Sequence, residues 1–171
     1  MAKETKSTLE VIERLKKISL FTHIKRDKAK LKKIATIIKK EKFLAGKYII
    51  VEGEVGDKMF ILNKGIVRIE KQTLAEDKFT IVNLKSDMNI FFGEQALMDN
   101  DTRSASILAV TDVECYTVKQ DRFEKLCNNN KDIGYCIVKE IAKILSTRLR
   151  KANIDNITLI EALVSGDGNG S

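Results

Sequence analysis

Apolar residues recur at helical spacing near both ends of the chain. Residues 7–18 and 27–41 each place an apolar residue at every third or fourth position, and lysines fill the opposite side of the second segment. A longer stripe of the same kind follows residue 131 and comprises Ile133, Ile137, Ile141, Ile144, Leu145, Leu149 and Ala152. This period predicts amphipathic helices before about residue 42 and after about residue 121.

The pattern between these helices is that of short strands. Six runs rich in β-branched and aromatic residues follow one another from about residue 43 to 120: YIIVEG, KMFILNKG, IVRIEKQT, FTIVNLKS, ASILAVT and VECYTVKQ. Strands repeated about every 8–12 residues with turn signals between them are typical of a sandwich or small barrel. Helices, then strands, then a long helix predict an α+β fold with the helices outside the sheet, not alternating βαβ units.

Composition narrows the class of protein. The chain has 171 residues, of which 43% are hydrophobic, so we expect a globular domain with a real core. No apolar run approaches the length of a membrane span and the N-terminus lacks an apolar signal segment, so we expect a cytoplasmic protein without a transmembrane segment. Three cysteines without CxxC spacing and a single histidine predict no metal site and no catalytic residues, and therefore no enzyme and no cofactor.

The net charge of +7 is concentrated in one segment. Residues 25–42 hold nine Lys or Arg against Asp27 and Glu41, which accounts for the whole excess. Such a basic helix can be a solvated face, or it can bind nucleic acid, an acidic lipid surface or an acidic partner. Both interpretations stay open, although the lysines have no interleaved aromatic residues of the kind that stack on single-stranded nucleic acid.

Candidate chemistry lies in residues 91–106, FFGEQALMDNDTRSAS. A glycine where a strand meets a helical turn lets the backbone approach a ligand, and the amides that open the turn can bind an anion. Arg103 lies nine residues after Glu94 and can bring a bidentate cation to the same anion. A carboxylate beside a phosphate is reasonable only if the ligand also offers a hydroxyl donor, as a ribose does. The pair therefore predicts a site for a phosphorylated sugar.

This stretch resembles the phosphate-binding cassette of cyclic nucleotide-binding domains, as in catabolite activator-type regulators, kinase regulatory subunits and nucleotide-gated channels. The cassette pattern is FGE-x-AL followed by R-x-A, and the frame G-x-x-I-I-x-x-G-x-x-G-D-x-M-F-I-L-x-x-G-x-V-x-I at residues 46–69 is similar to the family's first barrel strands. The resemblance covers residues 20–150. It implies an eight-stranded antiparallel β-roll of jelly-roll type with N-terminal helices and a long C-terminal helix.

The resemblance also implies a ligand, cAMP or cGMP, and roles for particular residues. By this resemblance, Glu94 is expected to bind the ribose 2′-hydroxyl and Arg103 the cyclic phosphate. The expected ligand-binding residues are Gly93, Glu94, Gln95, Ala96, Leu97, Arg103, Ser104 and Ala105. We expect cAMP rather than cGMP, because the family's cGMP readers more often carry threonine where Ser104 stands. One departure is Thr102, where the family often has a proline that sets the loop shape in advance.

Taken together, these features predict four parts of the chain. Helices at 1–42 pack on a cyclic nucleotide-binding roll at 43–120, C-terminal helices at 121–164 act as a lid or a dimer seam, and a flexible tail follows at 165–171. Polar residues near enough to the nucleotide base to reach it from the last helix are Arg148, Arg150 and Asn153.

We expect a regulatory sensor that signals by moving this last helix onto an unknown effector or a second copy of itself. The alternatives are a binding-inactive roll that acts as an interaction scaffold, and a basic adaptor for nucleic acid or membrane. The chain has no room for a winged helix after the roll, so we do not expect DNA binding of that kind.

Overall fold

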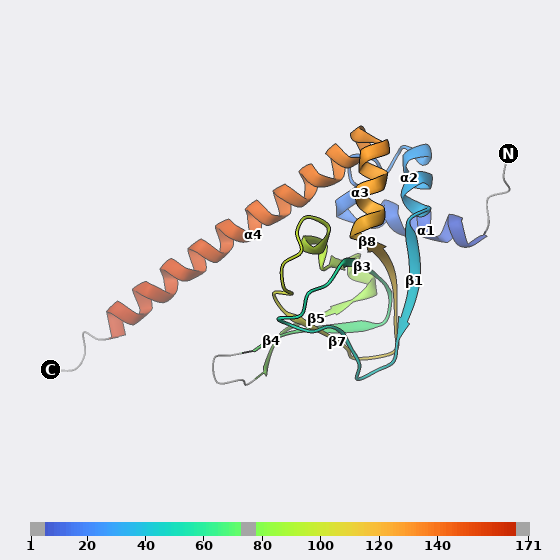
Figure 1. Cartoon of the computed structure of the whole chain (residues 1–171). Helices are drawn as coiled ribbons and strands as arrows, with labels where there is room; N and C mark the ends of the chain where they lie inside the picture. The colour runs from blue at the N-terminus through green and yellow to red at the C-terminus, as the bar shows by residue number, and fades with distance from the viewer. Residues whose placement is uncertain (1–5, 73–77, 167–171) are drawn as a thin grey trace.

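Two antiparallel sheets form the centre of the molecule (Figure 1). The computed structural model describes residues 6–72 and 78–166. Its elements, with η for a 3₁₀ helix, are α1 (Lys6–Lys17), η1 (Ser19–Phe21), α2 (Lys28–Ala35), β1 (Ile38–Phe43), β2 (Tyr48–Ile50), β3 (Lys58–Lys64), β4 (Ile66–Gln72), β5 (Lys78–Lys85), η2 (Ser86–Met88), β6 (Phe91–Phe92), η3 (Glu94–Leu97), β7 (Ser106–Ala109), β8 (Val113–Lys119), α3 (Gln120–Asn129) and α4 (Lys131–Gly166). The predicted α+β fold is confirmed.

The eight strands are shared equally between the sheets. One sheet has the order β1-β8-β3-β6 and the other β2-β7-β4-β5, so strands far apart in the sequence lie side by side. All of the pairs are antiparallel, for example Ile61 opposite Tyr116. This is the arrangement of an antiparallel roll, as predicted.

Alternate residues of β3 serve two different cores, as the two-residue period of a strand requires. Met59 and Ile61 face the helices that gather at one end of the roll, where they join a cluster built from α1, η1, α2, α3 and α4. Phe60 and Leu62 face the space between the sheets, where they meet Cys115. Burial there raises the pKa of the Cys115 thiol to about 12, so this side chain acts as a small apolar residue.

The second predicted helix is wrong in its length. We expected a helix over residues 27–41, but α2 ends at Ala35 and β1 begins at Ile38, so the roll starts before residue 43. Ile38 to Phe43 pair residue by residue with Val118 to Val113 of β8, and this pairing prevails over the helical spacing. The predicted basic helix is therefore divided, because its last lysines lie on a strand. The N-cap of α2 is Asp27, whose Oδ1 accepts a hydrogen bond from the Lys30 amide (3.0 Å).

The predicted stripe of the last helix is buried only in its first half. Ile133, Ile137 and Ile141, which we call the inner stripe, pack into the helical cluster, whereas Leu149 is exposed. Figure 1 shows why, since α4 slants away from the roll and its far end projects beyond the body. The helix also continues through residues 165 and 166, where a flexible tail was expected; residues 167–171 lie outside the described part of the chain.

Within residues 6–72 and 78–166, no helix is both long and apolar enough to cross a membrane. The same residues contain no cluster of three or more His, Cys, Asp or Glu side chains that could hold a metal ion.

Candidate functional site

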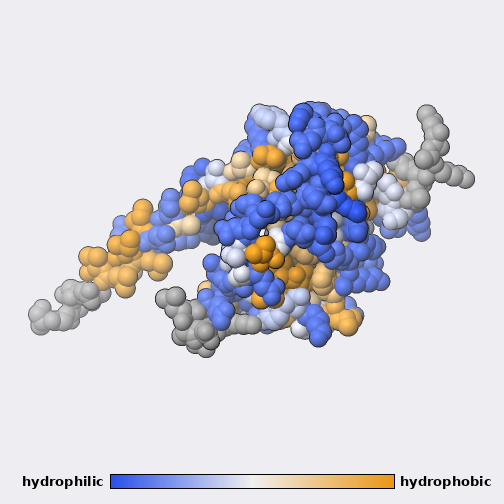
Figure 2. Space-filling model, viewed as in Figure 1, coloured by the Kyte–Doolittle hydropathy of each residue, from blue (hydrophilic) through white to orange (hydrophobic). Residues whose placement is uncertain are grey.

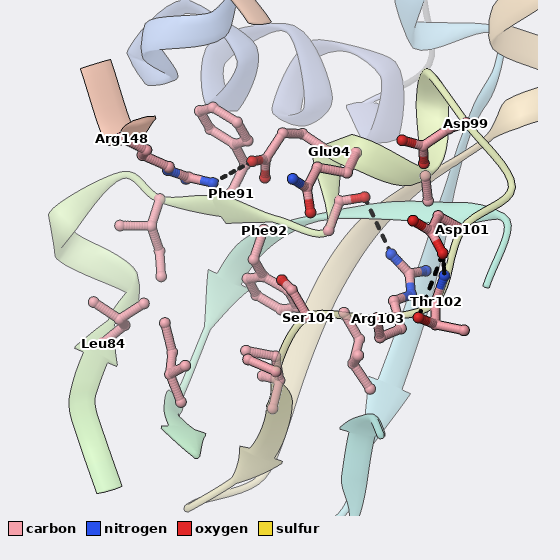
Figure 3. A pocket seen from close by; sticks show the side chains of 18 residues that line it. Leu84, Phe91, Phe92, Glu94, Asp99, Asp101, Thr102, Arg103, Ser104 and Arg148 are labelled. Atoms are coloured by element: carbon pink, nitrogen blue, oxygen red, sulfur yellow. Dashed lines mark hydrogen bonds and ion pairs between the residues drawn. The ribbon is translucent and has the colours of Figure 1, made fainter. Parts of the chain in front are cut away.

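A cavity of about 370 Å³ lies between the sheet β2-β7-β4-β5 and the segment that runs from β6 to Arg103 (Figure 3). This volume is within the usual range for small-molecule sites, about 300–1,000 Å³. The cavity has an apolar side, to which the strands contribute Ile50, Ile69, Leu84, Phe92 and Ile107. Its other side is polar and includes both η3 and one residue of α4, so the long helix reaches the site.

Seven of the eight residues predicted from the sequence line this cavity. They are Gly93, Glu94, Gln95, Ala96, Arg103, Ser104 and Ala105. The eighth, Leu97, does not lie in the wall: it is buried in the helical cluster beside α3 and α4. The tight turn of η3 sends successive side chains in different directions, and Leu97 ends on the side of the core.

Gly93 is required by its surroundings. Its φ of 71° is in the left-handed region, and it precedes η3 as the predicted junction between strand and helical turn. A Cβ at this position would lie 2.8 Å from Nη1 of Arg103 and 3.2 Å from the Lys58 carbonyl oxygen. The missing side chain therefore makes room for the guanidinium group.

The Arg103 guanidinium is held against main-chain carbonyls at the edge of the cavity. Nη2 donates to the Lys58 carbonyl (2.7 Å) and Nη1 to the Gly93 carbonyl (3.2 Å), which ties the cassette loop to β3. Partial burial lowers the pKa of Arg103 from its usual value, while the charges of Asp57 and Glu94 act in the opposite direction. Two of the five N–H donors of the guanidinium make these bonds, so others can meet an anion.

Glu94 is the buried acid of the site. It is 2% exposed, and its Oε1 accepts from Nη1 of Arg148, which reaches it from α4 (Figure 3). The Arg148 side chain is itself 58% exposed, so the ion pair lies at the mouth of the cavity. A buried carboxylate needs such a partner, since burying a charge without one is costly.

The cavity wall presents groups that can bind a ligand. Neither histidine nor cysteine is among the described residues of the cavity wall, so Ser104 has no neutral imidazole or thiolate beside it there. His23 lies elsewhere, with its Nε2 3.2 Å from Oε2 of Glu140. The cavity offers an apolar face, an acceptor at Glu94 and a cation at Arg103, and these fit a flat ligand with a hydroxyl and an anionic group.

The sequence left two parts of this site undetermined. Arg148 was one of three candidates on the last helix, and only the direction in which α4 presents its side chain separates it from Arg150 and Asn153. The apolar wall was missed entirely, because its residues follow the same alternating pattern as the core. The sequence pattern of the first strands included Gly56 but did not predict that this glycine lies against Arg103. A Cβ at position 56 would lie 2.5 Å from Nε of Arg103.

Comparison with known proteins decides the family. Residues 40–130, more than half of the chain, match the family model described as cyclic nucleotide-binding domain. The chain belongs to the cyclic nucleotide-binding domain family.

Relatives of known name agree with this assignment. A human cGMP-dependent protein kinase 2 is 33% identical over 143 residues, which cover 83% of this chain and 17% of the kinase. A Drosophila melanogaster cGMP-dependent protein kinase, isozyme 1, is 38% identical over 111 residues, which cover 61% of this chain and 14% of the kinase. The chain thus spans about a sixth of the length of these curated relatives.

A solved structure has the same fold. It is a cyclic nucleotide-binding domain from Methylobacillus flagellatus, with a TM-score of 0.73 and 20% sequence identity, and the match covers 90% of this chain and 84% of that one.

Proposed function

We propose that this chain is a regulatory sensor that binds a cyclic nucleotide in the cavity and reports binding through α4. The observation that carries the proposal is the Glu94–Arg148 ion pair, because it joins the cassette to the long helix at the wall of the site. A ligand that meets Glu94 therefore acts on a contact of α4 directly.

In the proposed complex, Arg103 binds the cyclic phosphate of the ligand. Its guanidinium lies beside Gly93, next to the amides that open η3 and have no partner within that short helix. These amides and the remaining donors of Arg103 can address the same anion. Asp99 and Asp101 also line the cavity, and Figure 3 shows Asp101 on the same side as Arg103.

In the same complex, Glu94 binds the ribose of the ligand. A carboxylate has about four lone-pair sites, so Glu94 can accept from the 2′-hydroxyl while it keeps its bond to Arg148. Ligand and helix then share one acceptor. This sharing supplies the differential contact by which a ligand can shift the position of α4.

Two observations bear on the base and point in opposite directions. Serine at position 104 led us to prefer cAMP from the sequence. The curated relatives, however, are named cGMP-dependent protein kinases, and the Ser104 hydroxyl lines the cavity. We give the relatives more weight and propose cGMP, with Ser104 as the residue that favours it by hydrogen bonding.

Calorimetric titration of the purified protein with cGMP, cAMP and 5′-AMP tests both levels of the proposal. We expect the two cyclic nucleotides to bind more tightly than 5′-AMP, and cGMP more tightly than cAMP. Ser104→Ala should reduce cGMP affinity and leave cAMP affinity unchanged. Tighter binding of cAMP would restore the preference drawn from the sequence.

Failure of every ligand to bind would leave the roll as an interaction scaffold.

A further inference from the structure

The ligand cavity is locally acidic, although the chain as a whole carries a net charge of +7. The charged side chains among the described residues of its wall are Glu94, Asp99, Asp101, Arg103 and Arg148. Glu94 and Arg148 form an ion pair and cancel each other. What remains is one cation, Arg103, against two carboxylates, Asp99 and Asp101. This balance is unfavourable for any anion, so the two carboxylates point to a requirement other than affinity.

The cassette loop holds Asp101 beside Arg103. The next residue, Thr102, donates its amide to Oδ1 of Asp101 (2.7 Å). Thr102 also pairs with Val55 in an isolated β-bridge, and the Arg103 amide donates to the Glu54 carbonyl (2.9 Å). The two residues after Asp101 are therefore tied to the segment that precedes β3. Figure 3 shows Asp101 on the same side of the cavity as Arg103.

Threonine in place of proline at position 102 makes this arrangement possible. A proline has no amide hydrogen, so it could not donate to Asp101. The departure from the family pattern thus supplies the bond that orients the Asp101 carboxylate. Asp99 is anchored through its main chain instead, since its amide donates to the Gln95 carbonyl (3.1 Å) and its carbonyl accepts from Nε2 of Gln120 (3.4 Å).

The charge of the phosphate is the property of the ligand that these carboxylates can read. A cyclic phosphodiester carries a single negative charge. The phosphate of a linear 5′-nucleotide carries about −1.5 to −2 at pH 7, because its second pKa is near 6. Arg103 is the one cation of the described wall outside the pair of Glu94 with Arg148. A second charge on the ligand therefore adds to the repulsion from the two aspartates.

We propose that Asp99 and Asp101 select cyclic against linear nucleotides by repelling the second charge of the linear phosphate. The inference rests on the proposed function, because it concerns the same ligand in the same cavity. Linear and cyclic nucleotides share their base and ribose, so the apolar wall and Glu94 meet the same groups in both. The carboxylates weaken binding of the cyclic ligand too, but they weaken binding of a doubly charged ligand more, which is how a repulsive element improves specificity.

Titrations of Asp101→Asn and of the double variant Asp99→Asn, Asp101→Asn test the proposal. The ligands are cGMP, 5′-GMP and the methyl ester of 5′-GMP, which is linear but carries a single charge. The measured quantity is the ratio of the dissociation constant of each linear ligand to that of cGMP. Each carboxylate that is removed should lower the ratio for 5′-GMP by about threefold, as expected of a partly screened charge interaction near a surface. The ratio for the methyl ester should not change.

Asp155→Asn is the matched control, because it removes the same charge from an exposed position of α4 outside the cavity wall. Both ratios should keep their parent values in this variant. Salt supplies a second control. In about 1 M salt the Debye length falls to about 3 Å, so the effect of Asp101→Asn on the ratio for 5′-GMP should disappear. A change in the shape of the loop would not respond to salt in this way.

The results that would overturn the proposal can be told apart. An unchanged ratio for 5′-GMP in the double variant, with cGMP still bound, would refute selection by charge and leave the proposed function intact. An equal shift for 5′-GMP and its methyl ester would show that the carboxylates act on the shape of the loop. Failure of cGMP to bind the parent chain would overturn the proposed function and this inference with it.

Discussion

At the scale of single residues, Arg103 has two tasks that a single measurement can confuse. Its bonds to the carbonyls of Gly93 and Lys58 hold the cassette loop on the roll, and its remaining donors are the ones proposed for the phosphate. A change at this position can therefore affect both the loop and the ligand. A useful variant must separate them.

Arg103→Ala should weaken binding of the cyclic nucleotide by about 10- to 100-fold, since a charge-assisted bond contributes about 1.5–3 kcal/mol. Arg103→Lys keeps the charge but loses the two-pronged donor geometry, and we expect an intermediate loss. Calorimetry measures both variants, and thermal unfolding without ligand reports the effect on the loop. Parent-like affinity in Arg103→Ala would show that this cation does not contact the ligand.

Glu94→Ala tests the ribose contact through a comparison of ligands. The variant should bind the cyclic nucleotide at least about fivefold more weakly, because the 2′-hydroxyl loses its acceptor. Binding of the 2′-deoxy analogue should fall less, because this ligand has no 2′-hydroxyl to lose its acceptor. Release of Arg148 from its partner affects both ligands alike and cancels in the comparison. Equal losses for the two ligands in competition titrations would contradict a role at the hydroxyl.

At the scale of elements, the sequence correctly predicted the helices and turns that depend on a few adjacent residues. The glycine and η3 were recovered because a left-handed residue followed by a one-turn helix depends on a few adjacent positions. Residues 36–41 were misassigned because their apolar spacing fits a helix, while the pairing of β1 with β8 joins positions 38 and 118, which no local pattern reveals. The same limit applies to the last helix, where the sequence showed a stripe but not how far the roll accompanies it.

The contact between α4 and the cassette predicts a small, specific effect of one arginine. Arg148→Ala should weaken nucleotide binding by up to about fivefold, since a half-exposed ion pair contributes about 0.2–1 kcal/mol. Arg150→Ala is the matched control, because Arg150 lies on the same turn of helix and bonds only to Thr147 among the described contacts (3.1 Å). Its affinity should equal that of the parent. Tighter binding in Arg148→Ala would mean that Arg148 competes with the ribose for Glu94 instead of sharing it.

At the scale of the whole molecule, α4 has two parts with different surroundings. Its first part completes the helical core, and its second part extends into solvent with its apolar side chains exposed (Figure 2). A truncation placed without regard to this division would not be informative. Ending the chain after Asn130 removes Ile133, Ile137 and Ile141 from the core, and losses of about 2–5 kcal/mol for each large apolar side chain approach the whole stability of a domain.

Ending the chain after Lys151 separates the two parts. This truncation keeps the inner stripe and Arg148 but removes the exposed side chains of Leu159 and Leu163. We expect a chain that unfolds at nearly the temperature of the parent and binds the cyclic nucleotide as tightly, because the core and the cavity wall are intact. Thermal unfolding and ligand titration on the same sample measure the two properties. If the shortened chain lost ligand affinity with its core intact, the distal helix would contact the nucleotide.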